Sequence, residues 1–304
     1  MLTVKMKDTQ GVVSECIPVS VVFYTEENVP ADSLMFSAEG IYLKEICTVE
    51  LLRDGKVIFD GEIDEQIVRY DISPVTEFVA RSQEAKLIDN EAYPMAFMNP
   101  SAEDIFTKYA ELFGFTLSVS ENKSYNGRFT VAKGTSCFAA IKRFAAEVYG
   151  AFPKAKGNVL YLDGIKNQGA VVLADENKSC CQRLSVGWLR CNRVSQVRVK
   201  IADNGGYDSG ISDEEACADG INKVRYLNVS SSGGATLSDA DKILSASKSD
   251  SFYAEALCTG YFGDALGKEA VHRYIDGDLY VSAIKYVSDK KGEYTRLTLR
   301  RKES

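Results

Sequence analysis

The sequence is poor in the side chains that most often carry enzyme chemistry. Its 304 residues include a single histidine, His272, and a single tryptophan, Trp188. A Ser/His or Cys/His catalytic pair needs a histidine as its base, and no GxSxG sequence is present. One histidine with no HExxH or CxxC spacing cannot build the common zinc sites. We therefore expect no catalytic residue, no metal-binding residue and no cofactor, with His272 in a structural role and Trp188 in the core.

Long hydrophobic runs and a secretory signal are also missing. No apolar run approaches the roughly 18 residues that cross a bilayer, and the N-terminal MLTVKMKDTQ has no apolar signal segment. We expect synthesis in the cytoplasm and no membrane partner. Without secretion, the cysteines are expected to be reduced thiols rather than a disulfide framework. These are Cys16, Cys47, Cys137, Cys180, Cys181, Cys191, Cys217 and Cys258.

An excess of positive charge is absent as well. The 36 Lys and Arg residues face 43 Asp and Glu residues, which gives a net charge of −7. Since phosphate-backbone binding depends on clustered basic side chains, we expect no specific binding of nucleic acid. The longest basic run, Arg300-Arg301-Lys302, is interpreted as a solvated tail. With 45% hydrophobic and 26% charged residues, the composition is that of a soluble globular protein of two or three domains.

Short motifs for phosphate and calcium fail on spacing. Gly263–Lys268 (GDALGK) has three residues between its glycines, and Glu269 stands where a phosphate-binding loop has Ser or Thr. Lys133-Gly134-Thr135 reverses that order. Asp203–Gly210 lacks the alternating acids and the closing Glu of a calcium loop. Acidic pairs such as Asp64-Glu65 arise by chance among so many acids, as does the run from Asp213 to Glu215.

Residues 1–84 have the pattern of β-strands. The clearest signal is Leu51–Gly61 (LLRDGKVIFDG), in which the Asp54-Gly55 turn signal separates two apolar runs. Alternation and β-branched residues predict strands at Ile17–Tyr24, Ile46–Leu52, Lys56–Phe59 and Thr76–Ala80, with a loop at Pro30–Asp32.

Residues 85–162 change to a helical period. Ser101 and Asp104 have capping-box spacing and start an amphipathic helix that Gly114 is expected to stop. A second helix is predicted from a cap at Thr135 or Ser136 to Gly150. Short strands are predicted at Phe115–Val119, Arg128–Ala132 and Val159–Leu162.

From residue 163 the pattern returns to strands. They are predicted at Ala170–Ala174, Leu184–Leu189 and Arg193–Ile201, the last with a bulge near Ser195-Gln196, and in a terminal hairpin of Leu279–Val287 and Tyr294–Leu299. Residues 203–238 are rich in Gly, Ser and acids. They are expected to be mobile except for one strand within Ile221–Val229, and a helix is predicted at Ser238–Ser247.

Taken together, the pattern predicts an α+β fold that is mainly β. Two β-barrel-like domains, residues 1–84 and 163–304, are expected to flank a small α/β insert at 85–162. The C-terminal domain should carry a helical or flexible insertion around 203–262.

Four stretches in this order resemble the baseplate hub proteins of contractile phage tails and related injection machines, the late-control-protein-D family. They are the hairpin VELLRDGKVIFDGEID, the segment FVARSQEAKLIDNEAYP, the two helices NPSAEDIFTKYAELFGF and KGTSCFAAIKRFAAEVYGAFP, and the late Asn192-Arg193-Val194 strand with the closing hairpin that ends YTRLTLR. Together they cover about two-thirds of the chain. None of them is a catalytic motif.

The resemblance implies a virion or prophage structural protein that forms a homotrimer. Its barrel domains would make a quasi-sixfold ring that joins the tail tube protein to a separate spike protein in the baseplate. The chain ends soon after the last strand, so we expect any cell-puncturing domain to be a separate chain. DNA would pass through an acidic lumen without specific binding. Two alternatives remain at this stage: a tail-associated glycan-binding protein, which would expose aromatic platforms, and a cell-wall hydrolase.

Overall fold

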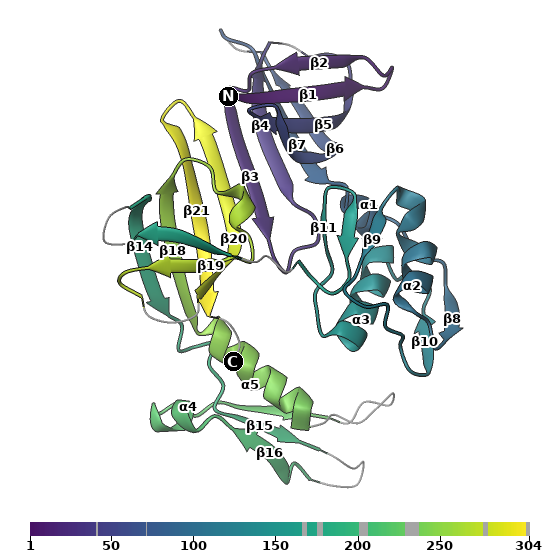
Figure 1. Cartoon of the computed structure of the whole chain (residues 1–304), viewed down its shortest axis with the longest axis vertical. Helices are drawn as coiled ribbons and strands as arrows, with labels where there is room; N and C mark the ends of the chain where they lie inside the picture. Colours follow the sequence, from purple (N-terminus) through teal and green to yellow (C-terminus); the bar gives the residue numbers. More distant parts are fainter. Residues whose placement is uncertain are drawn as a thin grey trace. The chain divides into compact units, whose positions relative to one another are not determined.

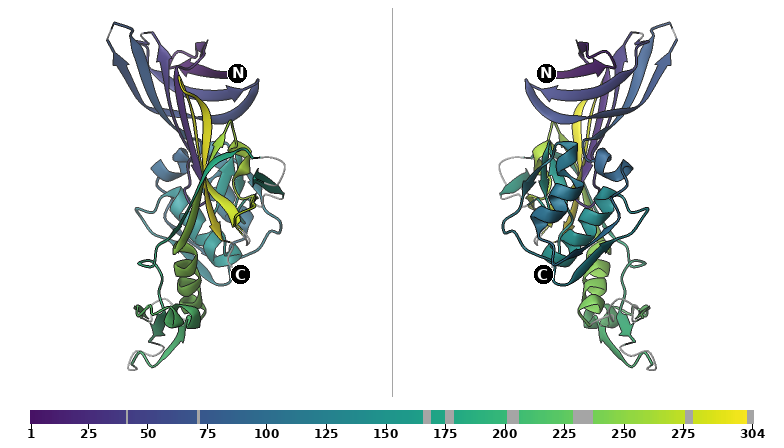
Figure 2. Two further views of the ribbon diagram at one scale, coloured as in Figure 1. Left: turned by 90° about the vertical axis from the view of Figure 1, so that its left-hand side faces the viewer. Right: turned by 90° about the vertical axis from the view of Figure 1, so that its right-hand side faces the viewer.

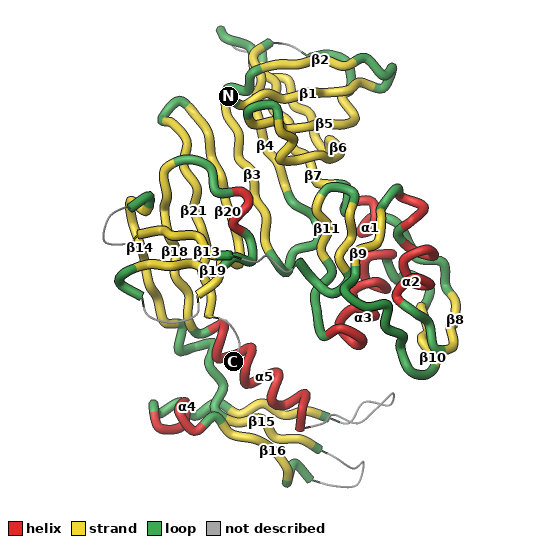
Figure 3. The backbone as a smooth tube through the Cα atoms, in the orientation of Figure 1, coloured by secondary structure: helices red, strands yellow, loops and turns green. Residues whose placement is uncertain are grey.

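The computed structural model describes residues 1–40, 42–70, 72–165, 169–174, 179–200, 206–228, 237–275 and 279–301. The chain divides into two compact units. The first comprises Met1–Gly169, Thr259–Lys268 and Ser282–Arg296, and the second comprises Ala170–Cys258, Glu269–Val281 and Leu297–Ser304. Strands far exceed helices in both (Figure 3), so the predicted α+β, mainly β class is confirmed. Division into domains at 1–84, 85–162 and 163–304 stays a prediction, as does closure of the sheets into barrels.

The first unit contains an antiparallel sheet in the order β20-β3-β4-β7-β6-β5-β1-β2 (Figure 1). Its strands are β1 (Leu2–Asp8), β2 (Val13–Cys16), β3 (Ser20–Glu26), β4 (Ser33–Glu39), β5 (Ile46–Arg53), β6 (Lys56–Arg69), β7 (Val75–Ser82) and the larger part of β20 (Leu279–Asp289). Alternate residues are buried along β1, β3, β4 and β7. The inward positions form one apolar core that includes Val4, Phe23, Leu34 and Phe78.

The predicted hairpin of β5 and β6 is confirmed. Both turn residues have positive φ, 50° at Asp54 and 79° at Gly55. That combination is typical of the two-residue turn whose twist matches antiparallel strands. At Gly61 a Cβ atom would lie 2.1 Å from the carbonyl oxygen of Arg81, so β6 and β7 approach closely there.

The insert also belongs to the first unit. Its helices are α1 (Ala85–Asp89), α2 (Ala102–Tyr109) and α3 (Cys137–Tyr149), with a 3₁₀ turn at Glu111–Phe113. Its strands are β8 (Met95–Met98), β9 (Thr116–Ser118), β10 (Arg128–Val131), β11 (Lys154–Lys156) and β12 (Val159–Tyr161). The apolar faces of the helices pack with β10 and β12 in a core of their own, separate from that of the large sheet.

The helix termini follow the predicted chemistry closely. Ser101 and Asp104 form the complete capping box of α2. The cap of α3 is Ser136 rather than Thr135, and Gly150 ends this helix in the left-handed conformation. The prediction that the first helix runs to Gly114 is wrong in detail, because α2 ends at Tyr109 and Gly114 ends the following 3₁₀ turn.

The second unit has a sheet and a smaller α/β part. Its larger sheet contains β14 (Cys181–Trp188), β18 (Phe252–Thr259), the later half of β21 (Gly292–Arg301) and the start of β20, with β13 (Ala170–Ala174) and β19 (Glu269–His272) paired in parallel. The smaller part has the order β16 (Ser209–Ser212), β15 (Gln196–Val199), β17 (Val224–Leu227). The long helix α5 (Leu237–Asp250) packs on one face of this small sheet, with the short α4 (Glu214–Ala218) beside it (Figures 1 and 2).

Three predicted strands need correction. The strand expected at Ile17–Tyr24 begins at Ser20. The strand expected at Leu184–Leu189 begins earlier, at Cys181, and its one register shift lies near that start. The strand expected at Arg193–Ile201 is shorter, since β15 covers Gln196–Val199. At its start, the backbone amides of Ser195 and Gln196 both donate to the carbonyl of Lys223. The pattern also gave no strand at the positions of β1, β2, β4, β8, β11, β16, β18 and β19.

The prediction of mobility across 203–238 is wrong for its described part. Residues 206–228 contain β16, α4 and β17, and Asp213 caps α4 while its carboxylate accepts from Arg193. The predicted strand within Ile221–Val229 is confirmed as β17, and the predicted helix as α5. The remainder of this prediction falls on residues 203–205 and 229–236, which lie outside the described residues. All eight cysteines are free. Among the described helices, none has the length and apolar character needed to span a membrane.

Candidate functional site

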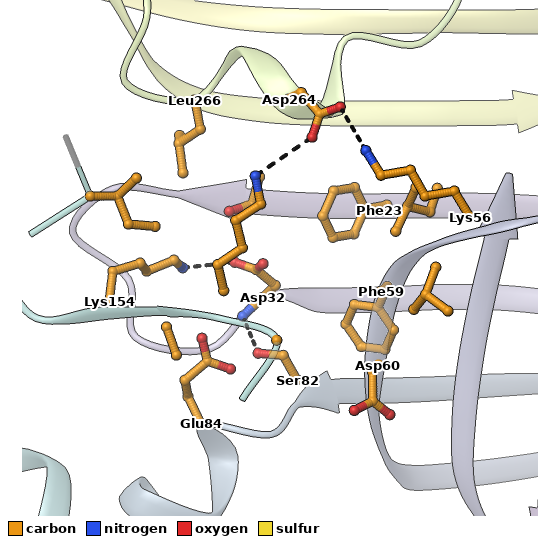
Figure 4. Close-up of a pocket in the computed structure, with 18 of the residues that line it drawn as sticks. Phe23, Asp32, Lys56, Phe59, Asp60, Ser82, Glu84, Lys154, Asp264 and Leu266 are labelled. Carbon is orange, nitrogen blue, oxygen red and sulfur yellow. Dashed lines mark hydrogen bonds and ion pairs between the residues drawn. The ribbon is translucent and has the colours of Figure 1, made fainter. Parts of the chain in front are cut away.

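A cavity of about 180 Å³ opens in the first unit between the large sheet and the insert (Figure 4). Phe23 of β3 and Phe59 of β6 form an apolar wall, with their rings in an edge-to-face contact at 6.0 Å. The other walls come from the loop before β4, from β11 and from the short 3₁₀ turn at Gly263–Ala265. The cavity therefore brings together segments from the start, the middle and the last sixth of the chain.

A buried ion pair crosses this cavity. Lys154 of β11 is 3% exposed, and its Nζ lies 2.7 Å from Oδ1 of Asp32. The same ammonium donates to the carbonyl of Val29 at 2.7 Å and faces that of Pro30 at 3.4 Å. A buried ammonium needs hydrogen-bond acceptors for its three N–H groups. The loop between β3 and β4 supplies these acceptors to Lys154.

Glu84 adds a second carboxyl group to the same site. It is 2% exposed, and Figure 4 shows its side chain reaching toward the Lys154–Asp32 pair. Burial raises the pKa of Glu84 to about 7, and the charge of Asp32 adds to this effect, while Ser82 and Lys154 oppose it. A carboxyl group that would be ionised in water thus holds a proton near neutral pH.

The mouth of the cavity carries exposed charges. Asp264 lies 3.8 Å from Nζ of Lys56 and 3.7 Å from Nζ of Lys156. All three side chains are at least 60% exposed, so water screens these pairs and each contributes little to stability.

A second polar cluster links β5 to the C-terminal hairpin within the first unit. Nη1 of Arg53 donates to Oε2 of Glu293 at 2.7 Å and to the hydroxyl of Tyr286 at 3.1 Å. The guanidinium also lies over the ring of Tyr261 at 5.2 Å. Burial raises the pKa of Tyr286 to about 12, with the charge of Glu293 adding to the effect. The phenol is therefore a neutral hydrogen-bond partner in this cluster.

Each unit also presents an edge strand with exposed apolar side chains. Among the described strands, β2 pairs only with β1, and Val13 within it is 63% exposed. In the second unit β14 pairs only with β18, and Val186 and Trp188 are 38% and 71% exposed. Among the described strands each of these lies at the end of its sheet, a position to which another strand can add.

The sequence candidates for chemistry do not converge on the cavity. His272 lies in the second unit, buried, and its Nδ1 accepts from the backbone amide of Tyr274. Burial lowers the pKa of His272, and the charge of Arg273 lowers it further, so the neutral imidazole is favoured. The prediction that Trp188 belongs to the core is wrong, since its ring is exposed at the edge of the sheet.

The charged sequences have local structural roles. The carboxylate of Asp64 accepts hydrogen bonds from Nε and Nη2 of Arg81, at 2.6 and 2.9 Å. The interpretation of Arg300 and Arg301 as a solvated tail is wrong, because both end β21. Arg300 pairs with Asp250, and the guanidinium of Arg301 lies 4.5 Å from the ring centre of Phe252. Lys302 lies outside the described residues.

The glycine-containing motifs lie in turns. The turn at Lys133-Gly134-Thr135 is held by a bond from the Gly134 amide to the carboxylate of Glu91. Gly263–Lys268 forms the 3₁₀ turn and loop that put Asp264 at the cavity mouth. Residues 206–210 of the acidic stretch lead into β16, while 203–205 lie outside the described residues.

Sequence reasoning missed Lys154, Asp32 and Glu84 altogether. The signal available was weak: Lys154 stands between Pro153 and Ala155 at the start of a short strand. The cavity can hold a proton on Glu84 and a fixed ion pair beside it. In the part of the chain that the structure describes, no group of three or more His, Cys, Asp or Glu side chains is placed to hold a metal ion.

Comparison by sequence finds no relative, since no protein-family model and no curated protein matches the chain. Comparison of structures does find proteins of similar fold. The tail protein of Neisseria meningitidis MC58 matches with a TM-score of 0.76 at 16% identity, over 99% of this chain and 96% of that protein. The 43 kDa tail protein of prophage MuSo2 from Shewanella oneidensis matches with a TM-score of 0.81 at 14% identity, over 99% and 98%.

A third similar structure belongs to a secretion machine. The c3393 protein of E. coli is a component of the type VI secretion system with structural similarity to the T4 tail proteins gp27 and gp5. It matches with a TM-score of 0.58 at 9% identity, over 99% of this chain and 77% of that protein. The resemblance inferred from the sequence is confirmed at the level of the fold: this chain has the fold of phage tail proteins and of a related injection-machine component.

Proposed function

We propose that this protein is the structural baseplate hub of a phage tail or of a phage-like contractile injection machine. In this role three copies form a ring that binds the tail tube protein on one side and the spike protein on the other. The observation that carries the proposal is the match to two tail proteins over nearly the full length of both partners. A match of that extent includes the sheets and the insert together, and is not limited to one widespread domain type.

The free edges of the two sheets support assembly into a ring. Another strand can add to an edge strand, and β2 and β14 carry exposed apolar side chains as well as one exposed charged residue each. Contacts between two different surfaces of identical subunits close into rings when the rotation between subunits permits. We therefore assign β2 and β14 to contacts with other subunits or with the tail tube.

The chemistry of the cavity supports a role without catalysis. Its buried ammonium is engaged by Asp32 and by backbone carbonyls. Lys154 is thus an anchor between insert and sheet rather than a nucleophile or base. With a net charge of −7, a ring of three copies would present an acidic interior along which DNA slides without specific binding.

Molecular mass in solution tests the proposal. The purified chain has a mass of 33.4 kDa, so a trimer measured by sedimentation or light scattering is expected at about 100 kDa. Because a hub can require its partner, the measurement is repeated in the presence of the tail tube protein of the same tail. A chain that stays monomeric both alone and with the tube protein contradicts the hub role.

One observation favours the second candidate, a glycan-binding tail protein. Trp188 is exposed, and aromatic rings of this kind stack on sugars. However, Trp188 pairs with Phe252 and Gly187 pairs with Tyr253, so the Trp188 and Tyr253 rings lie on opposite faces of the sheet. They do not form one platform. Binding of cell-wall glycans that is lost in Trp188→Ala would favour this candidate over the hub.

A further inference from the structure

Three cysteines of the second unit lie together where β14 begins. In the antiparallel ladder of β14 and β18, Cys181 stands directly opposite Cys258. Cys180, the preceding residue, is held by a hydrogen bond from its thiol to the carbonyl of Leu173 on β13, at 3.3 Å. The hub role proposed above makes no use of these thiols, and nothing in the fold requires a cysteine at three neighbouring positions.

The strand register brings Cys181 and Cys258 within bonding reach. Directly opposite residues of an antiparallel pair have Cα atoms about 4.5 to 5.5 Å apart, and their side chains share one face. A disulfide spans Cα separations of about 4.4 to 6.8 Å. Although the register shifts directly after Cys181, the thiols of Cys181 and Cys258 are in hydrogen-bonding contact, so the two sulfur atoms already lie close together.

The environment lowers the reactivity of both thiols in the folded chain but leaves one of them accessible. Cys258 is fully buried and Cys181 is half-buried. Burial raises the pKa of each, and the thiol of Cys258 interacts with those of both Cys181 and Cys180. Since the thiolate is the reactive form, oxidation should be slow at neutral pH and faster in alkaline solution.

We propose that Cys181 and Cys258 are an oxidation site that forms a cross-strand disulfide when the protein meets a low-molecular-weight disulfide such as oxidised glutathione. The thiolate of Cys181 attacks the glutathione disulfide, forms a mixed disulfide and releases one glutathione thiolate. The sulfur of Cys258 then loses its proton to solvent and displaces the second glutathione. Two protein thiols are oxidised and one glutathione disulfide is reduced to two thiols, so electrons balance.

The bond would fasten an edge strand that has only one neighbour. β14 pairs with β18 alone among the described strands, and most of its side chains are at least partly exposed on both faces. The bridge would also close a loop that contains the whole part from β15 to α5, which restricts the unfolded chain strongly. An assembled machine that leaves a reducing cell interior would thereby gain a covalent clamp at this edge.

Peptide mapping of the full chain tests the proposal. The protein is incubated with oxidised glutathione at pH 7 and at pH 8.5, alkylated, denatured and cut with trypsin without reductant. The expected product joins residues 179–183 to 249–268, forms faster at pH 8.5, and disappears on reduction. The oxidised chain should melt several degrees above the reduced chain, since a bridge across a long loop stabilises the fold.

Single variants identify the partner, because Cys180 and Cys181 share one tryptic peptide. The cross-link should be lost in Cys181→Ser and in Cys258→Ala and retained in Cys180→Ser. If it persists in Cys181→Ser and is lost in Cys180→Ser, the assignment is overturned. Absence of any cross-link in the unaltered chain at both pH values, with glutathione adducts only, also overturns it. The melting temperature of each reduced variant verifies that the fold is intact.

Discussion

Lys154 and Asp32 form an ion pair of 2.7 Å although 122 positions of sequence separate them. Lys154 comes from the insert and Asp32 from the loop before β4. Since the pair is largely removed from water, removing one partner leaves a charge that neither solvent nor protein neutralises fully. The pair therefore fixes how the insert meets the sheet within the first unit.

Replacement of this lysine should destabilise the chain severely. We expect Lys154→Met to lower the free energy of unfolding by about 3 kcal/mol, because Asp32 and two carbonyls lose their donor. The double variant Lys154→Met with Asp32→Asn should recover part of this loss. Urea unfolding measures both. The matched control is Arg69→Met, which breaks the exposed Arg69–Glu77 pair and should cost less than about 1 kcal/mol. Equal losses of unfolding free energy in Lys154→Met and Arg69→Met would show that the buried ion pair stabilises the fold no more than the exposed one.

Glu84 should make stability depend on pH. Its pKa rises from 4.5 to about 7 on folding, so the folded state binds this proton more tightly than the unfolded state. The resulting stabilisation is complete below pH 4.5 and is lost as the pH rises through 7. Glu84→Gln stays neutral. The free energy of unfolding of the parent chain should therefore fall by about 2 to 3 kcal/mol between pH 5 and pH 8 through Glu84, and that of Glu84→Gln should not show this fall.

The control for this effect is Glu103→Gln, at an exposed position in the first turn of α2. The change in its free energy of unfolding between pH 5 and pH 8 should equal that of the parent chain. A Glu84→Gln curve that runs parallel to the parent curve would mean that Glu84 is ionised in the folded protein.

Gly61 should not tolerate a side chain. A Cβ atom there would lie 2.1 Å from the carbonyl oxygen of Arg81, and a neighbouring backbone cannot move aside as a flexible side chain can. We expect Gly61→Ala to cost about 2 to 3 kcal/mol in thermal or urea unfolding. Glu65→Ala, at an exposed position of the same strand, should change stability by no more than about 0.5 kcal/mol. A neutral Gly61→Ala would show that β6 and β7 can separate without loss.

Positive charges introduced on the β14 edge should weaken assembly without weakening the fold of the single chain. Lysines placed at Val186 and Trp188, both exposed, should leave the melting temperature of the monomer nearly unchanged. They should reduce the trimer fraction or the binding of the tube protein, because edge lysines oppose strand addition. Leu112→Lys, at an exposed position of the insert, serves as the control. Full assembly of the double variant would place the interface elsewhere.

Trypsin should distinguish a folded from a loose segment at β17. The Lys223 amide donates to the Ser195 hydroxyl at 3.0 Å, and the Lys223 carbonyl accepts from the Ser195 and Gln196 amides. A protease must extract this backbone to cut it. Cleavage after Lys223 and Arg225 should therefore be far slower in the native chain than in urea, which mass spectrometry of timed digests can follow. Early cuts at both sites in native buffer would contradict an ordered β17.

Local signals were sufficient for much of the fold. The Asp54-Gly55 turn, the Ser101–Asp104 capping box and the Gly150 stop are each fixed by residues within a few positions of one another. Such features depend on backbone conformation and side-chain-to-backbone bonds, which the sequence displays directly. The same reasoning failed at Trp188, where an apolar residue in a strand was placed in the core although the strand is an edge.

The cavity could not be derived from sequence for a physical reason. Each of its charged residues is unremarkable in its own segment, and only the fold brings Asp32, Glu84 and Lys154 together. The prediction of mobility after residue 203 failed in a related way. Composition counted glycines, serines and acids, but it did not show that Arg193 pairs with Asp213 or that α5 packs against β15.

The pairing of β20 with β3 has a consequence for biosynthesis. Residues 283–288 pair with residues 21–26. A strand synthesised early, β3, therefore cannot form this pairing until nearly the whole chain has been synthesised. During that interval the nascent chain carries β3 with one side open, and a pairing of such high contact order forms slowly. Chaperones that shield exposed strands, or a slow rate of translation through the last hairpin, would then govern how much of the protein reaches its native form.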